Sequence, residues 1–289
     1  MLAKNPQAQP CARWLLEEYS LEMTAKDIGD LEDSADDIAA GTQISLTYLP
    51  KEDMQARLVA ARGASRMGFC PIPHLSARRL ASENELLAYL AGIKALNIDS
   101  VLVVAGDLSE PSGPYADALA LIDSGLLESH GIRRVAITGY PEGHPDIGEE
   151  KLMAALEAKR ASLSSRGLEC EIITQFGFDA ESIENWLTTL RARGVRERVR
   201  IGIPGPANAK TLLRYAARCG VGASTKVAAK YGLSITRLLV PTGPDRLLDD
   251  LGERLDPGLH GPVSLHFYPF GGFEKTARWV DAYARMTGC

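Results

Sequence analysis

The sequence lacks the long apolar runs, signal-type leader and basic surplus that mark several large classes of protein. No apolar stretch approaches the ~20 residues that a transmembrane helix needs, and Met1–Pro6 has no signal-peptide apolar region. The net charge of −5 argues against nucleic acid as the main partner, because binding phosphates requires a basic surface. We therefore expect a cytoplasmic protein with no membrane or nucleic-acid partner. The sequence does not indicate its oligomeric state.

Paired cysteines are also missing. The chain has five cysteines, an odd number, and no two have C-x-x-C spacing. Scattered cysteines of this kind predict reduced thiols rather than a disulfide framework. Cys70 and His74 could supply only half of a metal site, so we expect no metal.

Several catalytic motifs are absent as well. The sequence contains no G-x-S-x-G elbow, no Walker loop and no H-E-x-x-H, which disfavours serine hydrolases, P-loop enzymes and zinc proteases of these types. No G-x-G-x-x-G follows the first strand-like run, which weakens an open dinucleotide-binding sheet as the fold.

The chain does contain short β-branched runs that alternate with longer segments of helical periodicity. Such alternation predicts βαβ units and a parallel sheet. The expected strands are Tyr19–Met23, Gln43–Tyr48, Gly68–His74, Ser100–Ala105, Arg133–Tyr140, Glu169–Phe176, Arg198–Ile203 and Val263–Tyr268. The expected helices include Leu80–Leu96, Tyr115–Leu127, Leu152–Ser165, Glu181–Arg193 and Glu274–Met286.

Eight strands with intervening helices predict an α/β fold of the (β/α)8 TIM barrel type, with an open doubly wound sheet as the competitor. The 289 residues suit one barrel domain, 1–289, with an N-terminal extension 1–18. The long gap before the last strand, Asn208–Leu255, should hold two or three helices with a break at Gly220–Thr225.

The active site of a barrel lies at the carboxyl ends of its strands, which directs attention to the residues there. Glu22 lies in an apolar run, and burial favours the neutral form of a carboxyl group, as a general acid requires. The alternatives are a helix cap or an arginine partner. Asp107 follows Gly106, where the backbone can approach a ligand closely. Its alternative is the N-cap of the next helix.

Four further strand ends carry polar side chains. Gln175 can both donate and accept hydrogen bonds, which suits the amide edge of a heterocycle, although it could equally fix a loop. His74 and His144 could contact a phosphate or a flavin edge, or could be structural. His266 is interpreted mainly as a packed core histidine.

These strand ends together resemble the methylenetetrahydrofolate reductase family of the bacterial catalytic-domain type. The resemblance extends from about Tyr19 to Arg285. The strongest motifs are Gly-Tyr-Pro-Glu-Gly-His-Pro at Gly139–Pro145 and Ile-Thr-Gln-Phe-Gly-Phe-Asp at Ile173–Asp179. In chain order with them are Ser20–Met23, Leu46–Tyr48, Pro73–Ser76 and Gly106–Asp107.

The resemblance implies a barrel with FAD at the carboxyl ends of the strands. It implies hydride transfer from NADH or NADPH through the flavin to 5,10-methylenetetrahydrofolate, giving 5-methyltetrahydrofolate, a reaction of one-carbon metabolism and methionine biosynthesis. Its catalytic residues would be Glu22, as the acid that protonates N10 of the folate, and Asp107. The implied cofactor-binding residues are Thr47, His74, Ala105, Gly106, Asp107, Tyr140, His144 and Lys159. The implied substrate-binding residues are Gln175, Phe176, Thr211 and Tyr215.

The chain also departs from the family pattern. Ala105 replaces an arginine, and Leu152 and Ala155 replace polar residues that face the adenosine part of FAD. Thr211 and Tyr215 stand where the family has a glutamine and a phenylalanine. Losing one charge-assisted contact costs about 1.5–3 kcal/mol, so we expect weak FAD binding.

The expected function is thus a flavin-dependent interconversion of methylene- and methyltetrahydrofolate, with a bias toward oxidation of 5-methyltetrahydrofolate. One alternative is a flavin-independent relative that transfers hydride directly. The other is a non-catalytic folate-binding barrel.

Overall fold

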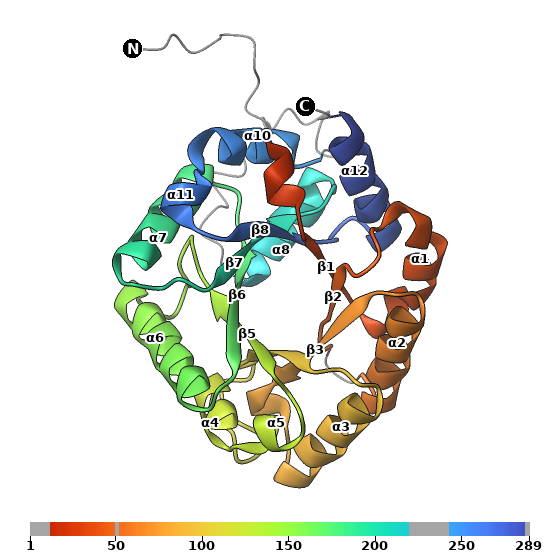
Figure 1. The fold of residues 1–289 in the computed structure, drawn as a ribbon, viewed down its shortest axis with the longest axis vertical. Helices are drawn as coiled ribbons and strands as arrows, with labels where there is room; N and C mark the ends of the chain where they lie inside the picture. The colour runs from red at the N-terminus through yellow and green to blue at the C-terminus, as the bar shows by residue number, and fades with distance from the viewer. Residues whose placement is uncertain (1–11, 50–51, 220–242, 287–289) are drawn as a thin grey trace.

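The computed structural model describes residues 12–49, 52–219 and 243–286. Eight parallel strands form a closed barrel in which each strand pairs with the next and β8 pairs with β1 (Figure 1). The predicted (β/α)8 barrel is therefore confirmed. The strands are β1 Ser20–Met23, β2 Gln43–Leu46, β3 Cys70–Ser76, β4 Ser100–Val104, β5 Arg134–Gly139, β6 Glu169–Phe176, β7 Arg198–Pro204 and β8 Val263–Tyr268.

Burial on both faces explains the uninterrupted apolar strands. In β4, Val101 and Val103 belong to the main core under the helices, whereas Leu102 belongs to a separate cluster inside the barrel. The inner cluster also contains Ile72 and Ala136 from the two neighbouring strands. Alternate residues of one strand thus face two apolar environments, as expected for a parallel sheet covered by helices.

Helices surround the barrel (Figure 1). The α-helices are α1 Ile28–Asp33, α2 Met54–Arg66, α3 Glu83–Ala95, α4 Ala118–Asp123, α5 Leu126–Ser129, α6 Glu149–Ser165, α7 Ala180–Ala192, α8 Ala209–Cys219, α10 Asp245–Arg254, α11 Pro257–His260 and α12 Phe273–Met286. The 3-10 helices are η1 Ala12–Leu16, η2 Ala25–Asp27, η3 Ala35–Asp37 and η4 Ala77–Arg79. The predicted break at Gly220–Thr225 lies outside the described residues.

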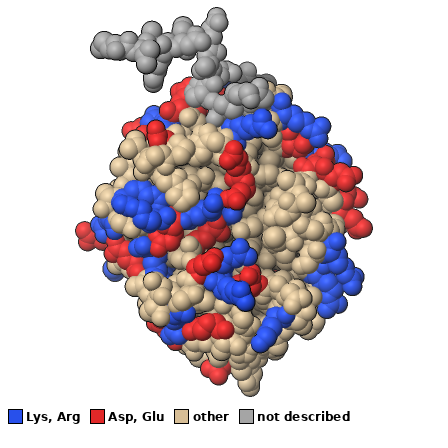
Figure 2. Space-filling model, in the orientation of Figure 1, with Lys and Arg blue, Asp and Glu red and all other residues tan. Residues whose placement is uncertain are grey.

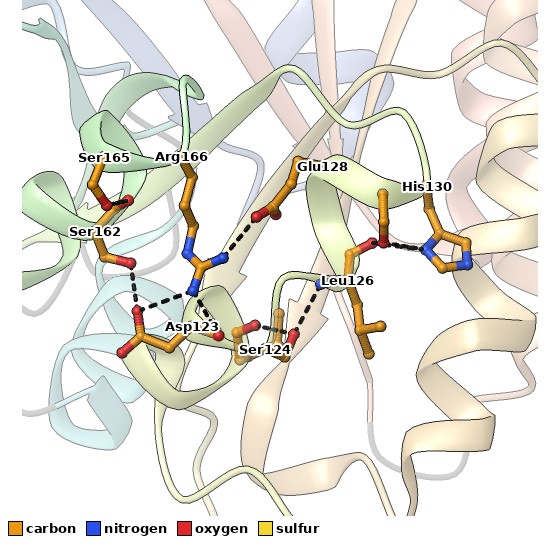
Figure 3. Close-up of polar contacts among 10 residues, drawn as sticks. Asp123, Ser124, Leu126, Glu128, His130, Ser162, Ser165 and Arg166 are labelled. Carbon is orange, nitrogen blue, oxygen red and sulfur yellow. Dashed lines mark hydrogen bonds and ion pairs between the residues drawn. The ribbon is translucent and has the colours of Figure 1, made fainter.

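One predicted helix, Tyr115–Leu127, is in fact two. The chain turns at Gly125, whose φ of 75° is left-handed and favours glycine, and this separates α4 from α5. Arg166, at the end of α6, stabilises the turn between α4 and α5. Its guanidinium donates to the Glu128 carboxylate and to the Asp123 carbonyl, both at 2.7 Å (Figure 3).

The amino end of the barrel is covered in part by η1, which lies within the expected extension 1–18. Leu15 of η1 is fully buried, and η1 packs against α10 and β8. In the described part of the chain, no helix combines the length and the apolar character of a membrane span.

Candidate active site

Glu22 lies between two histidines inside the barrel. It is on β1, and its Oε2 atom is 3.8 Å from Nε2 of His74 on β3 and 3.7 Å from Nε2 of His266 on β8. The Glu22 side chain is 18% exposed, whereas the His266 side chain is fully buried. Neither Nε2 atom has a hydrogen-bond partner among the residues that the structure describes. Two buried nitrogens therefore converge on one carboxyl oxygen.

His266 is held through its second ring nitrogen. Its Nδ1 atom lies 2.8 Å from Ser20 Oγ, which also lies 3.5 Å from the Leu265 carbonyl oxygen. With Nδ1 engaged in this way, Nε2 is the ring nitrogen that faces the Glu22 carboxyl. The sequence interpretation of His266 as core packing missed this contact, because no local pattern links Glu22 to a residue 244 positions later.

His74 stays neutral at physiological pH. Burial is the main cause that lowers its pKa from 6.5 to about 4, against the opposing influence of the Glu22 carboxyl. A neutral His74 imidazole adds no positive charge to the surroundings of Glu22.

Acidification is expected to destabilise the protein through His74. Because its folded pKa is about 4, the unfolded chain takes up a proton between roughly pH 6.5 and pH 4 that the folded protein does not. The free energy of unfolding should fall by about 3 kcal/mol from this group as the pH drops from about 7 to about 4. Urea unfolding at both pH values measures it. His74→Gln should remove the loss of about 3 kcal/mol between pH 7 and pH 4, whereas His130→Gln should retain it. An equal dependence of unfolding free energy on pH in the two variants would contradict the role of His74.

Except for Lys159 on α6, the residues expected to bind a cofactor lie at the ends of four neighbouring strands, β2 to β5. Tyr140 and His144, which follow β5, form an edge-to-face ring pair with centroids 5.6 Å apart. The Asp146 N–H donates to His144 Nδ1 at 3.2 Å, so the neutral ring carries its proton on Nε2 as a hydrogen-bond donor. Thr47 after β2 is partly exposed, whereas His74, within β3, is buried.

Asp107 is held by an arginine that the sequence interpretation missed. Arg79 contacts Asp107 Oδ1 through Nε at 2.7 Å and through Nη2 at 2.6 Å. The alternative role of Asp107 as an N-cap is wrong, since Asp117 caps α4. Gly106, with φ 94°, needs the conformational freedom of glycine, and a Cβ there would collide with the Ser76 hydroxyl.

The neighbouring Arg78 fixes the loop that carries Asp107. Its backbone N–H donates to the Ala105 carbonyl at 2.9 Å. Its side chain donates to the Ala116 and Leu108 carbonyls at 2.7 and 2.9 Å. The adjacent arginines thus have separate tasks: Arg78 binds the loop backbone and Arg79 binds the Asp107 carboxylate.

The residues expected to bind the substrate are at the end of β6 and in α8. Gln175 is half-buried, and its side chain bonds to no other described residue, so the loop-fixing alternative has no contact to support it. Phe176 is only 1% exposed and packs edge-to-face against Tyr268, which places it behind the surface. Tyr215 is stacked on Phe270 with ring centroids 4.0 Å apart. The Thr211 N–H donates to Asn208 Oδ1 at 2.8 Å, in the first turn of α8.

Lys159 is not brought together with the other predicted residues. It lies in the third turn of α6 and is 8% exposed, and burial lowers its pKa. The titratable groups near it are the Cys170 thiol, close to the start of β6, and Asp117. The start of a strand is the opposite end from the predicted site. Nearer to that site, Leu152 of α6 lines a small hollow with Tyr140.

A cavity of about 620 Å³ opens at the amino ends of the strands, opposite this site. Its three arginines among the described residues already have carboxylate partners: Arg200 pairs with Glu171 at 2.7 Å, Arg198 with Glu18 at 2.6 Å and Arg134 with Asp99 at 3.0 Å. Acidic and basic side chains are intermixed across the middle of the face in view in Figure 2. The amino end of a barrel serves stability, so we assign the chemistry to the smaller carboxyl-end site around Glu22.

Comparison with known proteins gives matches in both sequence and structure. The family model of methylenetetrahydrofolate reductase matches residues 18–232. Methylenetetrahydrofolate reductase (NADH) 1 of Arabidopsis thaliana is 26% identical over 198 residues, which cover 62% of this chain and 32% of the plant protein. The chain therefore spans about a third of the length of this curated relative.

Two solved structures are similar to the chain over most of its length. One is an uncharacterised protein from Clostridium thermocellum that binds two copies of 5-methyl-5,6,7,8-tetrahydrofolic acid; it has a TM-score of 0.53 and 9% identity and covers 93% of this chain and 94% of its own. The other, dihydropteroate synthase from Thermus thermophilus, has a TM-score of 0.49 and 13% identity and covers 93% of each chain. At 9% identity, the likeness to the Clostridium thermocellum protein shows the fold alone.

Proposed function

The chain belongs to the methylenetetrahydrofolate reductase family, and we propose that it is a flavin-dependent oxidoreductase that interconverts 5,10-methylenetetrahydrofolate and 5-methyltetrahydrofolate. The observation that carries the proposal is that the Glu22 carboxyl faces two buried histidines at the carboxyl end of the barrel. A carboxyl group in such surroundings suits proton transfer in a partly dry site.

Glu22 would act on N10 of the folate. In the reductive direction it donates a proton to N10, the N10–methylene bond breaks, and the carbon is left as an iminium on N5 that can accept a hydride. In the oxidative direction the carboxylate accepts the N10 proton as the ring closes. His74 and His266 keep the carboxyl oriented, since their Nε2 atoms lie 3.8 and 3.7 Å from one of its oxygens.

FAD, when bound, supplies the hydride acceptor and donor. The residues of the β2–β5 ends fit such a group, because they offer the donor Nε2–H of His144, the tight backbone at Gly106 and the partly exposed Tyr140 ring. Ala105 and Leu152 offer no polar contact there, so we propose that FAD is bound weakly. Two lost contacts of about 1.5–3 kcal/mol each would weaken binding by a hundredfold or more, at about 1.4 kcal/mol per tenfold.

The physiological direction is proposed to favour oxidation of 5-methyltetrahydrofolate. Phe270 already covers a face of Tyr215, with ring centroids 4.0 Å apart and planes within 15° of parallel. A nicotinamide ring could stack on that face of Tyr215 only if Phe270 moved. This contact disfavours reduction of the flavin by NADH or NADPH. It does not affect hydride transfer between the flavin and the folate.

Anaerobic mixing of the FAD-loaded protein with each donor separately tests the proposal. We expect 5-methyltetrahydrofolate to bleach the flavin absorption faster than NADH or NADPH does. Bleaching by NADH but not by methylfolate would overturn the direction. A colourless protein that turns over without added flavin would favour the flavin-independent alternative, and no turnover under any condition would favour a folate-binding barrel.

A further inference from the structure

A carboxylate in one of the two strongest sequence motifs binds the backbone of the other. Glu142 lies in the loop after β5, and its Oε1 accepts hydrogen bonds from the N–H groups of Phe178 at 2.5 Å and Asp179 at 2.9 Å. The loop after β6 contains both donors. One oxygen thus joins two loops that are 36 residues apart at the closer contact.

The absence of a side chain at Gly177 leaves room for this contact. A Cβ built on Gly177 would lie 2.8 Å from Glu142 Oε1, closer than side chains normally approach, so glycine is what allows the carboxylate to reach the backbone. Phe178 and Asp179 also immediately precede α7, whose N-cap residue Asp179 makes no side-chain capping bond to the helix backbone. A negative charge is favoured at that end of a helix by the helix dipole.

The joined loops carry different predicted functions. The loop of Glu142 also holds Tyr140 and His144, which are expected to contact the flavin. The segment that Glu142 binds directly follows Gln175, which is expected to contact the folate. Their relative placement sets the distance and angle between the two reactants, and a hydride transfer depends steeply on both.

We propose that Glu142 is a positioning residue that fixes the cofactor-binding loop against the substrate-binding loop. This inference rests on the proposed function for the identity of the two ligands, but the contact itself can be tested without either. Glu142 holds the two loops in register through its bonds to Phe178 and Asp179, and it transfers no proton to substrate.

Amide hydrogen exchange tests the contact in the ligand-free protein. Glu142→Ala should speed exchange at Phe178 and Asp179 by about 10- to 100-fold, the worth of a hydrogen bond to a charged acceptor. Exchange in the central strands should not change. Glu150→Ala, which removes an exposed carboxylate from the first turn of α6, is the matched control and should leave Phe178 and Asp179 protected.

Ligand measurements test the consequence. Glu142→Ala should raise the FAD dissociation constant and lower kcat/KM for folate, each by about 10- to 100-fold, through kcat as well as KM. Glu142→Gln keeps an acceptor oxygen and should restore most of this loss. Gly177→Ala should displace the Glu142 carboxylate, because the added Cβ would lie 2.8 Å from Oε1. It should therefore have the same effect as Glu142→Ala. If both variants break the same contact, the double variant should lose no more activity than either single variant.

The possible results distinguish the positioning role of Glu142 from the proposed function of the protein. Unchanged exchange at Phe178 and Asp179 in Glu142→Ala, or faster exchange with unaltered FAD affinity and kcat/KM, would overturn the positioning role. Faster exchange throughout the barrel would show that Glu142 supports the fold as a whole, which would also overturn it. A wild-type protein that turns over no folate, with the exchange result as expected, would refute the proposed function and leave the contact standing.

Discussion

Replacing Glu22 with Gln should lower folate turnover by about 10²- to 10⁴-fold, the usual range for loss of a general acid. Gln keeps the size and the hydrogen-bonding oxygen of the side chain but cannot deliver a proton to N10. The His74 and His266 nitrogens at 3.8 and 3.7 Å would then face an amide group that does not titrate. Steady-state turnover of methylfolate with an artificial electron acceptor measures the loss.

Flavin binding should survive the same change, because Glu22 is not itself among the predicted FAD contacts and Gln keeps the shape of the side chain that faces His74. Titration of Glu22→Gln with FAD should give a dissociation constant within a factor of about two of the wild-type value. Glu110→Gln, an exposed carboxylate after β4, is the control for turnover. Wild-type turnover in Glu22→Gln would show that the protein is a folate binder or that another group supplies the proton.

The second large effect concerns stability at the opposite end of the barrel. Arg200→Met should lower the free energy of unfolding by about 3–5 kcal/mol, because it leaves a partner charge unpaired inside the protein. Arg200 is 3% exposed. Its guanidinium donates to the Glu171 carboxylate at 2.7 Å, to the Glu18 carbonyl and to the Ser264 hydroxyl at 3.4 Å.

Two further variants show whether burial is the cause. Arg198→Met breaks an ion pair whose Arg198 and Glu18 side chains are 37% and 65% exposed, and it should cost at most about 1 kcal/mol. Arg200→Met combined with Glu171→Leu removes both charges and should recover most of the loss. Denaturant unfolding measures all three. Equal losses from the Arg200 and Arg198 variants would contradict the account.

Most of the barrel could be predicted because its strands are buried on both faces. The apolar run Val101–Val104 has no alternation, which pointed to a parallel strand, and β6 has the predicted bounds. The break between α4 and α5 could not be predicted in the same way, since apolar residues continue across Gly125. Its partner, Arg166, comes from α6 and lies next to the break only in the folded chain.

Individual residues of the candidate site could be predicted from the sequence, but most of their contacts could not. Glu22 stood out as a carboxylate in an apolar strand, but no local signal paired it with His266, which is 244 positions later. Arg79 was passed over because a charged residue after a strand is usually solvated. Glu142 was visible within its motif, but its contact with Phe178 depends on how two loops meet. Tertiary contacts of this kind depend on the closed barrel and leave no trace in local patterning.

The central claim is that this barrel exchanges a hydride between flavin and the folate one-carbon unit. The most direct measurement begins with the FAD-loaded protein reduced chemically under anaerobic conditions, with no nicotinamide present. On addition of 5,10-methylenetetrahydrofolate, the account predicts that the flavin absorption returns and that one 5-methyltetrahydrofolate forms per flavin reoxidised. A flavin that stays reduced while the folate remains unchanged would contradict it.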